Sequence, residues 1–171
     1  MRTPTWALCL LGVCLGLSPL AAQGTPVAKI NQAGDFLDLE RDGQTVREFL
    51  PVHRTVGARY FSAGVGLEER SAAYPPFPLK IVFTAGGKPF LSGVAVTIQP
   101  AKGGPALVIP REQVEGPWLF VDLAPGLYEI VARDGDHEQQ LKGVKIESGK
   151  QRVLYFRWNQ DHGVAGRLPA E

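Results

Sequence analysis

The feature that most constrains the fold is a series of short apolar runs in the second half of the chain. Each run is rich in β-branched and aromatic residues and is bounded by Gly, Pro, Asp or Ser. Runs of this length and spacing are typical of strands in an all-β sandwich. We therefore predict an all-β fold, a Greek-key β-sandwich of about seven strands over residues 79–84, 94–99, 106–109, 118–123, 127–133, 137–147 and 151–158.

Alternation within the runs supports this interpretation. In VAVTIQ (94–99), Val94, Val96 and Ile98 fall on one side of an extended chain, and Ala, Thr and Gln fall on the other. Burying side chains of this size is worth about 1.5–3 kcal/mol each. Two such sheets that face each other can therefore form a core.

The stretch FVDLAPGLY (120–128) joins two of these runs. Pro125 fixes one backbone angle of the connection, and Gly126 tolerates the positive angle that a tight turn can require. We interpret the stretch as a corner between two strands rather than as a catalytic motif.

Four motifs give the chain a family resemblance: GVAVTI (93–98), FVDLAPGLY (120–128), GVKI (143–146) and VLYF (153–156). With these motifs, residues 79–158 resemble the carboxypeptidase regulatory-like, or transthyretin-like, domain. The resemblance implies a β-sandwich without catalytic activity of its own. The segment YFSAGVGLEER (60–70), followed by LKIVF (79–83) and GPWLF (116–120), also resembles a group of small exported proteobacterial proteins that contain this sandwich.

Residues 1–23 have the order of a secretory signal peptide. Arg2 precedes an uncharged apolar stretch, and the small residues Ala21 and Ala22 follow it. We expect cleavage after Ala22 or Gly24 and export of the rest of the chain, to the periplasm or alternatively to the outside of the cell. The apolar stretch is shorter than the ~20 residues that span a bilayer, so an uncleaved anchor is the less favoured alternative.

This segment also contains both cysteines, Cys9 and Cys14, so packing without disulfides must hold the remainder together. Beyond Arg2 the chain carries 17 basic and 17 acidic residues. Nucleic-acid binding draws most of its affinity from an excess of positive charge. The sequence therefore predicts no nucleic-acid partner.

Residues 24–78 are expected to form an irregular segment, because glycines and prolines interrupt most of it. Within it, Asp42-Gly43 predicts a turn between two short strands. A weak helix over 44–50 and a short helix over 67–73 are also expected. Residues 159–171 have no periodicity and are predicted to be a flexible tail.

The densest cluster of candidate metal ligands is Asp134, Asp136, His137 and Glu138. Carboxylates are typical calcium ligands, and histidine is a typical zinc ligand. The same residues are also typical of a tight hairpin turn, so both interpretations stay open. The segment AGVG (63–66) lacks the third glycine and the βαβ context of a dinucleotide site. We expect no cofactor.

No catalytic set is evident. Ser62 lies outside a Gly-x-Ser-x-Gly elbow, and the histidines at positions 53, 137 and 162 are scattered. The best hint of binding is a set of aromatic residues in the irregular segment, which we predict as a weak candidate partner surface: Tyr60, Phe61, Tyr74 and Phe77.

We therefore expect a non-enzymatic, exported binding or structural module that acts through protein contacts. A carbohydrate-binding sandwich is the first alternative, and exposed coplanar Trp or Tyr rings would favour it. A small hydrolase is the second alternative, and a cleft holding His53 or His137 beside Ser62 or a carboxylate would favour it.

Overall fold

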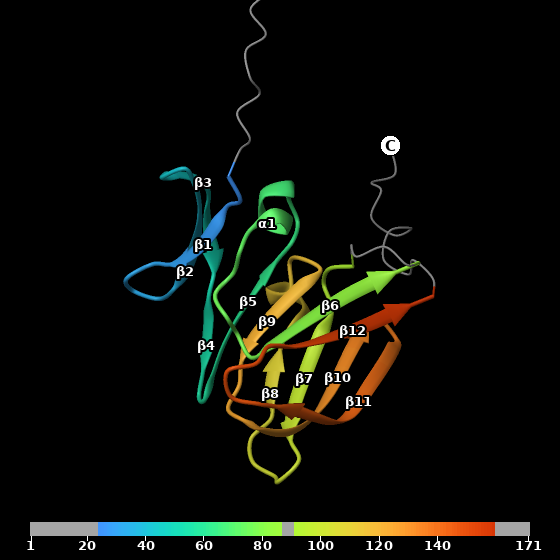
Figure 1. The fold of residues 1–171 in the computed structure, drawn as a ribbon. Helices are drawn as coiled ribbons and strands as arrows, with labels where there is room; N and C mark the ends of the chain where they lie inside the picture. Colours follow the sequence, from blue (N-terminus) through green and yellow to red (C-terminus); the bar gives the residue numbers. More distant parts are fainter. Residues whose placement is uncertain (1–23, 87–90, 160–171) are drawn as a thin grey trace, which may run out of the picture.

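The computed structural model describes residues 24–86 and 91–159 of the chain and has an all-β fold (Figure 1). All seven strands expected in the second half are present, and each end lies within one residue of the expected one. Their bounds are β6 Leu79–Ala85, β7 Ala95–Pro100, β8 Leu107–Ile109, β9 Trp118–Asp122, β10 Gly126–Asp134, β11 His137–Ile146 and β12 Arg152–Trp158.

These strands form two layers of a sandwich. One sheet has the order β11-β10-β7-β8, and the other contains β12-β6-β9. Strand β12 pairs with β6 in parallel, so that Leu154 lies beside Ile81, whereas the other pairs are antiparallel. The 120–128 stretch carries the chain from β9 in one sheet to β10 in the other, which confirms its interpretation as a corner.

The alternating side chains of the two sheets meet in one core. Ile81, Phe83 and Phe156 from one sheet are at most 1% exposed, as are Ile98 and Ile130 from the other. Ile98 lies on the apolar face that the alternation in residues 94–99 indicated. The core explains why the sandwich needs no disulfide.

The segment 24–78 is not irregular, which corrects the expectation. It contains five strands and one short helix: β1 Val27–Ile30, β2 Phe36–Arg41, β3 Gln44–Pro51, β4 His53–Thr55, β5 Ala58–Ala63 and α1 Leu67–Ser71. The predicted Asp42-Gly43 turn is confirmed, with positive φ at both residues (52° and 78°). The turn returns the chain alongside β2, so residues 44–50 form strand β3 and the helix expected there is wrong.

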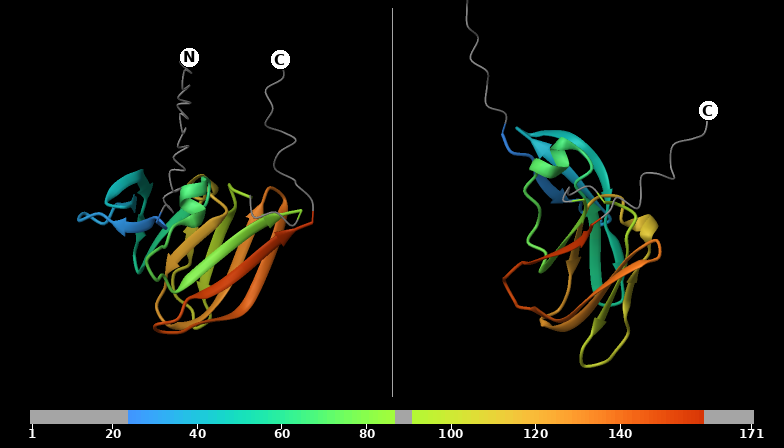
Figure 2. Two further views of the ribbon diagram at one scale, coloured as in Figure 1. Left: turned by 45° about the horizontal axis from the view of Figure 1, so that its top comes forward. Right: turned by 90° about the vertical axis from the view of Figure 1, so that its right-hand side faces the viewer.

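The first three strands form a separate sheet with the order β1-β2-β3, while β5 and β4 extend the β12-β6-β9 sheet to five strands. Figure 2 shows β1–β3 and α1 on one side of the molecule, away from β10 and β11. This N-terminal layer packs on the outer side of β5 and β9. The five-stranded sheet is therefore covered on both sides where β5 and β9 lie.

A second core joins the N-terminal layer to that sheet. Phe61 of β5 stacks on Phe120 of β9 with ring centroids 4.6 Å apart, and Phe77 meets Phe61 edge-on at 5.0 Å. Leu37 and Leu39 of β2 are fully buried in the same cluster. Tertiary packing of these rings, rather than local sequence pattern, orders the segment before β6.

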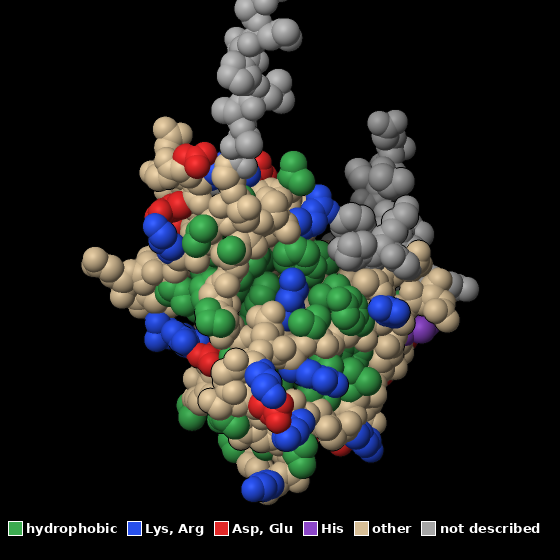
Figure 3. All heavy atoms as spheres, in the orientation of Figure 1, with side chains coloured by type: hydrophobic (Ala, Val, Ile, Leu, Met, Phe, Trp, Pro, Cys, Tyr) green, Lys and Arg blue, Asp and Glu red, His purple; other side chains and the backbone are tan. Residues whose placement is uncertain are grey.

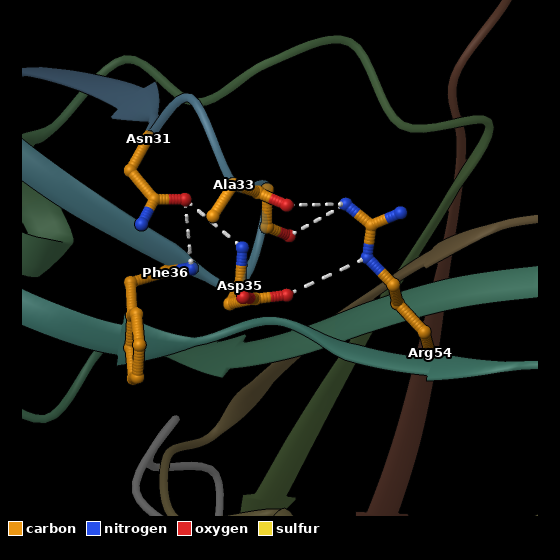
Figure 4. A network of polar contacts seen from close by, with 6 residues as sticks. Asn31, Ala33, Asp35, Phe36 and Arg54 are labelled. Carbon is orange, nitrogen blue, oxygen red and sulfur yellow. Dashed lines mark hydrogen bonds and ion pairs between the residues drawn. The ribbon is translucent and has the colours of Figure 1, made fainter.

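Arg54 of β4 ties the β1–β2 turn to the main sheet (Figure 4). Its guanidinium donates to the carbonyls of Ala33 and Gly34 at 3.3 and 3.0 Å and lies 3.9 Å from the Asp35 carboxylate. Within the turn, the side-chain oxygen of Asn31 accepts from the backbone N–H of Asp35 at 2.9 Å. These bonds hold the N-terminal layer to the sandwich at a second place.

The expected signal peptide, residues 1–23, lies outside the described residues, as does most of the expected flexible tail, at 160–171. In the part of the chain that is described, no helix has the length and apolar character needed to cross a membrane.

The second core makes a stability prediction. Phe61→Ala should lower the free energy of unfolding by about 3–5 kcal/mol, because it removes a fully buried ring that three other aromatic side chains contact. Urea unfolding followed by tryptophan fluorescence measures the change. The control is Leu67→Ala, at a side chain that is 70% exposed, which should change stability little. Equal effects of the two substitutions would contradict the packing described.

Candidate functional site

Two free sheet edges lie at the same end of the sandwich. Strand β8 is the last strand of the four-stranded sheet, and β4 is the last strand of the five-stranded sheet. An apolar groove of about 510 Å³ separates the β4–β5 hairpin from the β7–β8 hairpin. Its size is within the range of ligand sites in proteins, and it is our candidate functional site.

Core residues form the floor of this edge groove. Ile98 of β7, Leu123 at the end of β9 and Tyr128 of β10 line it from below. The Tyr128 hydroxyl donates to the Ala124 carbonyl at 2.8 Å, which fixes the corner that joins the two sheets. Burial raises the pKa of the Tyr128 hydroxyl above 10.0, so it remains a donor at neutral pH. The corner motif thus supplies a rigid base for the groove.

Exposed apolar side chains form the rim of the edge groove. Val56, at the tip of the β4–β5 hairpin, is 99% exposed, and Val108 of β8 is 62% exposed. The facing loop turns through Gly103 and Gly104, both with positive φ, and the Gln99 side chain donates to the Gly104 carbonyl at 2.9 Å. Solvent-exposed valine side chains therefore lie on both sides of the opening of the edge groove.

Among residues 24–86 and 91–159, no further strand pairs with the outer edge of β8 or of β4. Strand β8 pairs only with β7, through Ile109, Val108 and Leu107. Strand β4 pairs only with β5. An edge strand presents N–H and C=O groups that an extended peptide can bind, although the short length of β8 and the following Pro110 limit how many.

The edge groove continues into a polar hollow along β4 and β5, which shares Thr55, Gly57 and Ala58 with it. Arg59 donates to the Asp122 carboxylate through Nε at 3.1 Å and through Nη2 at 2.7 Å. One end of the site is therefore apolar, and the other end offers a charged pair.

His53 precedes Arg54 on β4, and its ring stacks on Tyr60 of β5 with centroids 5.2 Å apart. Burial lowers the pKa of His53 below its ordinary value of 6.5, and Glu115 acts in the opposite direction. Ser62 lies on another part of β5, where its hydroxyl accepts from the Gly116 N–H at 2.8 Å and lies within donating distance of two carbonyls. Within the described residues, the hydrogen-bond partners of Ser62 are backbone groups of Gly116 and Trp118 and include no histidine, which the hydrolase hypothesis would have favoured.

Glycine-rich segments can bind phosphate through their backbone N–H groups. The segment at residues 63–66 instead binds a carboxylate of this same chain. Glu69 is 2% exposed and accepts from the backbone N–H groups of Gly64 at 2.8 Å and Val65 at 3.1 Å. The backbone of this segment thus binds a buried carboxylate of α1.

The candidate metal ligands do not converge. Asp134 is buried on the inner face of β10, whereas Asp136, His137 and Glu138 are exposed on the hairpin, and Glu138 pairs with Arg133. Among the described residues, no group of three or more His, Cys, Asp or Glu side chains could hold a metal ion. The hairpin turn expected at these residues is present, with Asp134 paired to His137 across it.

The four aromatic residues predicted as a partner surface lie in or beside the cores. Tyr60, Phe61 and Phe77 are at most 3% exposed, and Tyr74 is half-buried against Phe120. This corrects the prediction, because three of the four have almost no accessible surface. Tyr60 belongs to the sandwich core, whereas Phe61, Tyr74 and Phe77 belong to the second core, on the outer face of β5 and β9.

The edge groove was missed by the sequence analysis. The available signal was a valine inside each of two turn-flanked stretches, at Val56 beside Gly57 and at Val108 near Gly103-Gly104-Pro105. Valine is uncommon at an exposed hairpin tip, since β-branched residues favour strands.

Exposed, coplanar aromatic rings that would favour sugar binding are not found among the described residues. Trp158 is 4% exposed, and the ring of Trp118 is covered by the Lys80 ammonium at 3.7 Å from its centroid. Tyr155 is 52% exposed, but the Arg157 guanidinium lies over it at 5.0 Å.

The corner generates a prediction. Tyr128→Phe should lower the free energy of unfolding by about 1 kcal/mol, because it removes the hydrogen bond to the Ala124 carbonyl and leaves the ring in place. Chemical denaturation measures this loss. Tyr155→Phe, at an exposed ring, is the matched control and should be neutral. A neutral result for Tyr128→Phe would mean that the bond does not secure the corner.

The lowered pKa of His53 predicts a pH dependence. A pKa below the unfolded value means that the unfolded chain takes up the proton first as the pH falls, so stability declines below about pH 6.5. His53→Phe keeps a ring on Tyr60 and removes the titration. Between pH 7 and pH 5, the variant should lose less stability than the wild type in urea unfolding. An equal loss in both proteins would contradict the prediction.

No family model, curated protein or solved structure matches this chain. The resemblance to the carboxypeptidase regulatory-like domain therefore depends on the motif residues themselves. The structure places those of the 120–128 motif at the corner between the two sheets.

Proposed function

We propose that this chain is a non-enzymatic, exported binding module that acts through protein contacts and belongs to the carboxypeptidase regulatory-like type. The observation that carries the proposal is the apolar edge groove between two free sheet edges, rimmed by Val56 and Val108. The signal-peptide order of residues 1–23 supports export, with the periplasm as the favoured compartment.

The chemistry of the edge groove favours an extended peptide as its ligand. Unpaired backbone groups of β8 or β4 can add a strand by hydrogen bonding, and the apolar floor can take alternate side chains of that strand. A sugar would need open aromatic faces, and a hydrolase would need a nucleophile beside a base. The described residues of the groove offer neither arrangement.

The experiment expresses the full chain, including residues 1–23, and purifies the resulting protein. Peptides that bind this protein are then selected from a phage-displayed library of random peptides. Peptides that bind the wild type are then tested on Val108→Asp, which places a charge on the free edge of β8. We expect binding to fall by about tenfold or more, since an unpaired charge at an apolar contact costs well over 1 kcal/mol.

Val27→Asp is the matched control, because Val27 is also an exposed valine (45%) on an edge strand, in the N-terminal layer. It should leave peptide binding unchanged. If no peptide is selected, or if both variants bind as the wild type does, the edge groove is not the binding site. A circular dichroism spectrum of each variant checks that the fold is intact.

A further inference from the structure

The outer side of β11 is a further sheet edge, at the opposite end of the four-stranded sheet from β8. In the part of the chain that the structure describes, β11 is the longest strand, with 10 residues, and no other strand pairs with its outer side. No residue from His137 to Gly143 is buried. Figure 2 shows the N-terminal layer on the other side of the molecule, so this layer does not cover β11.

The backbone groups of β11 point alternately toward β10 and away from it. The β10–β11 turn has only two residues, so the residues on either side of the turn exchange backbone hydrogen bonds. The alternation of an antiparallel pair then directs the N–H and C=O groups of Glu138, Gln140 and Lys142 away from β10. Gly143, with a φ of 67°, lies in the register shift that ends this regular stretch. We call the outer side of residues 137–142 the β11 edge.

The β11 edge carries one acidic and one basic side chain. Leu141 packs against the sandwich core, so the side chains of Glu138, Gln140 and Lys142 lie on the opposite, solvent side of the sheet. The Glu138 Oε2 accepts from Arg133, which leaves Oε1 for a second cation. Lys142 has no ion pair within residues 24–86 and 91–159. The two charges are four residues apart, with Gln140 midway between them.

The surface around the β11 edge is mainly polar. In Figure 3, hydrophobic side chains gather over the middle of the visible face, whereas the lower right margin, where β11 lies in Figure 1, shows mainly backbone, polar and charged groups. A partner at this edge would therefore bury little apolar surface. Backbone hydrogen bonds and the pattern of charge must determine which partner fits.

A second copy of the chain is such a partner, and charge selects how it pairs. When two copies of β11 pair antiparallel about a two-fold axis, residues that direct backbone groups outward lie opposite each other. An axis at Glu138 or at Lys142 places that residue opposite itself, and like charges directly opposite destabilise a sheet. An axis at Gln140 places Glu138 of each copy opposite Lys142 of the other. Charged residues that commonly keep edge strands apart thus favour this one register.

We propose that the β11 edge pairs antiparallel with the same edge of a second copy of this chain, about a two-fold axis at Gln140, and so forms a dimer. Three residue pairs exchange about six backbone hydrogen bonds, and a Glu138–Lys142 pair lies on each side of the axis. The four-stranded sheets of the two copies become one continuous sheet. Because β8 is the far end of each sheet, both edge grooves stay open, and the inference stands independently of the proposed function.

The first test is sedimentation velocity of the full chain. A small polar interface binds weakly, so a reversible monomer–dimer equilibrium should be visible between about 1 μM and about 1 mM. Lys142→Glu should raise the dissociation constant about tenfold or more, because two like-charge pairs replace two opposite-charge pairs. The control is Lys102→Glu, which makes the same change at an exposed residue between β7 and β8 and should leave the dimer unchanged.

A charge exchange tests the register. Glu138→Lys alone should also weaken the dimer about tenfold or more, because it places lysines opposite each other. The double variant Glu138→Lys/Lys142→Glu restores opposite charges across the axis, so its dissociation constant should return to within about threefold of the wild type. Circular dichroism checks that each variant keeps its fold.

Cysteine cross-linking reports the register without a change of charge pattern. In a background with Cys9 and Cys14 replaced by serine, Gln140→Cys places the two cysteines opposite each other, with Cα atoms about 5.5 Å apart and within disulfide reach. Mild oxidation should then give a covalent dimer on a denaturing gel. Lys142→Cys places its two cysteines about 13 Å apart along the strands and should stay uncross-linked.

Several outcomes would overturn the proposal. A chain that stays monomeric up to about 1 mM forms no such dimer. Equal dissociation constants for Lys142→Glu and Lys102→Glu remove the β11 edge from the interface. A double variant that stays as weak as the single ones, or equal cross-linking of Lys142→Cys and Gln140→Cys, contradicts the register. Loss of the dimer in Val108→Asp alone assigns self-association to the edge groove.

Discussion

The rest of the structure depends on the burial of both faces of β9. Its residues Trp118-Leu-Phe-Val121 are apolar without interruption, so an exposed side of this strand would leave Phe120 in water. Leu119 and Val121 are buried in the sandwich core, and Phe120 is buried in the second core, beneath the N-terminal layer. The N-terminal layer is therefore required to cover the outer side of β9.

Sequence periodicity was sufficient for the sandwich and insufficient for the layer that covers it. Strands β7, β10 and β12 each have one core face, so their sequences alternate between buried and more exposed residues. In YFSA (60–63) all four residues are buried, because the two sides of β5 face two different cores, and no alternation results. Strand β3 was misread as a helix because its pairing with β2 decides its conformation, and local propensity does not show that pairing.

The candidate sites also divide into those set by neighbouring residues and those set by tertiary packing. The corner was predictable because Pro125, Gly126 and Tyr128 are neighbours in sequence and act within one turn. The edge groove was not, because Val56 and Val108 come together only when the β4–β5 and β7–β8 hairpins end at the same side of two different sheets. The aromatic residues at 60–77 suggested a surface, but aromatic side chains contribute as strongly to a core, and only tertiary packing distinguishes the two.

The parallel pairing of β12 with β6 has a consequence for the order of assembly. The partners Leu79 and Arg152 are separated by two complete hairpins and the corner, and β12 follows every other strand in the described chain. Contacts between residues so distant in sequence form slowly, since a long loop must close before they are gained. While the chain is being synthesised, β6 therefore keeps one unpaired edge until β12 has emerged, and during that interval the molecule is most open to pairing with a second copy of itself.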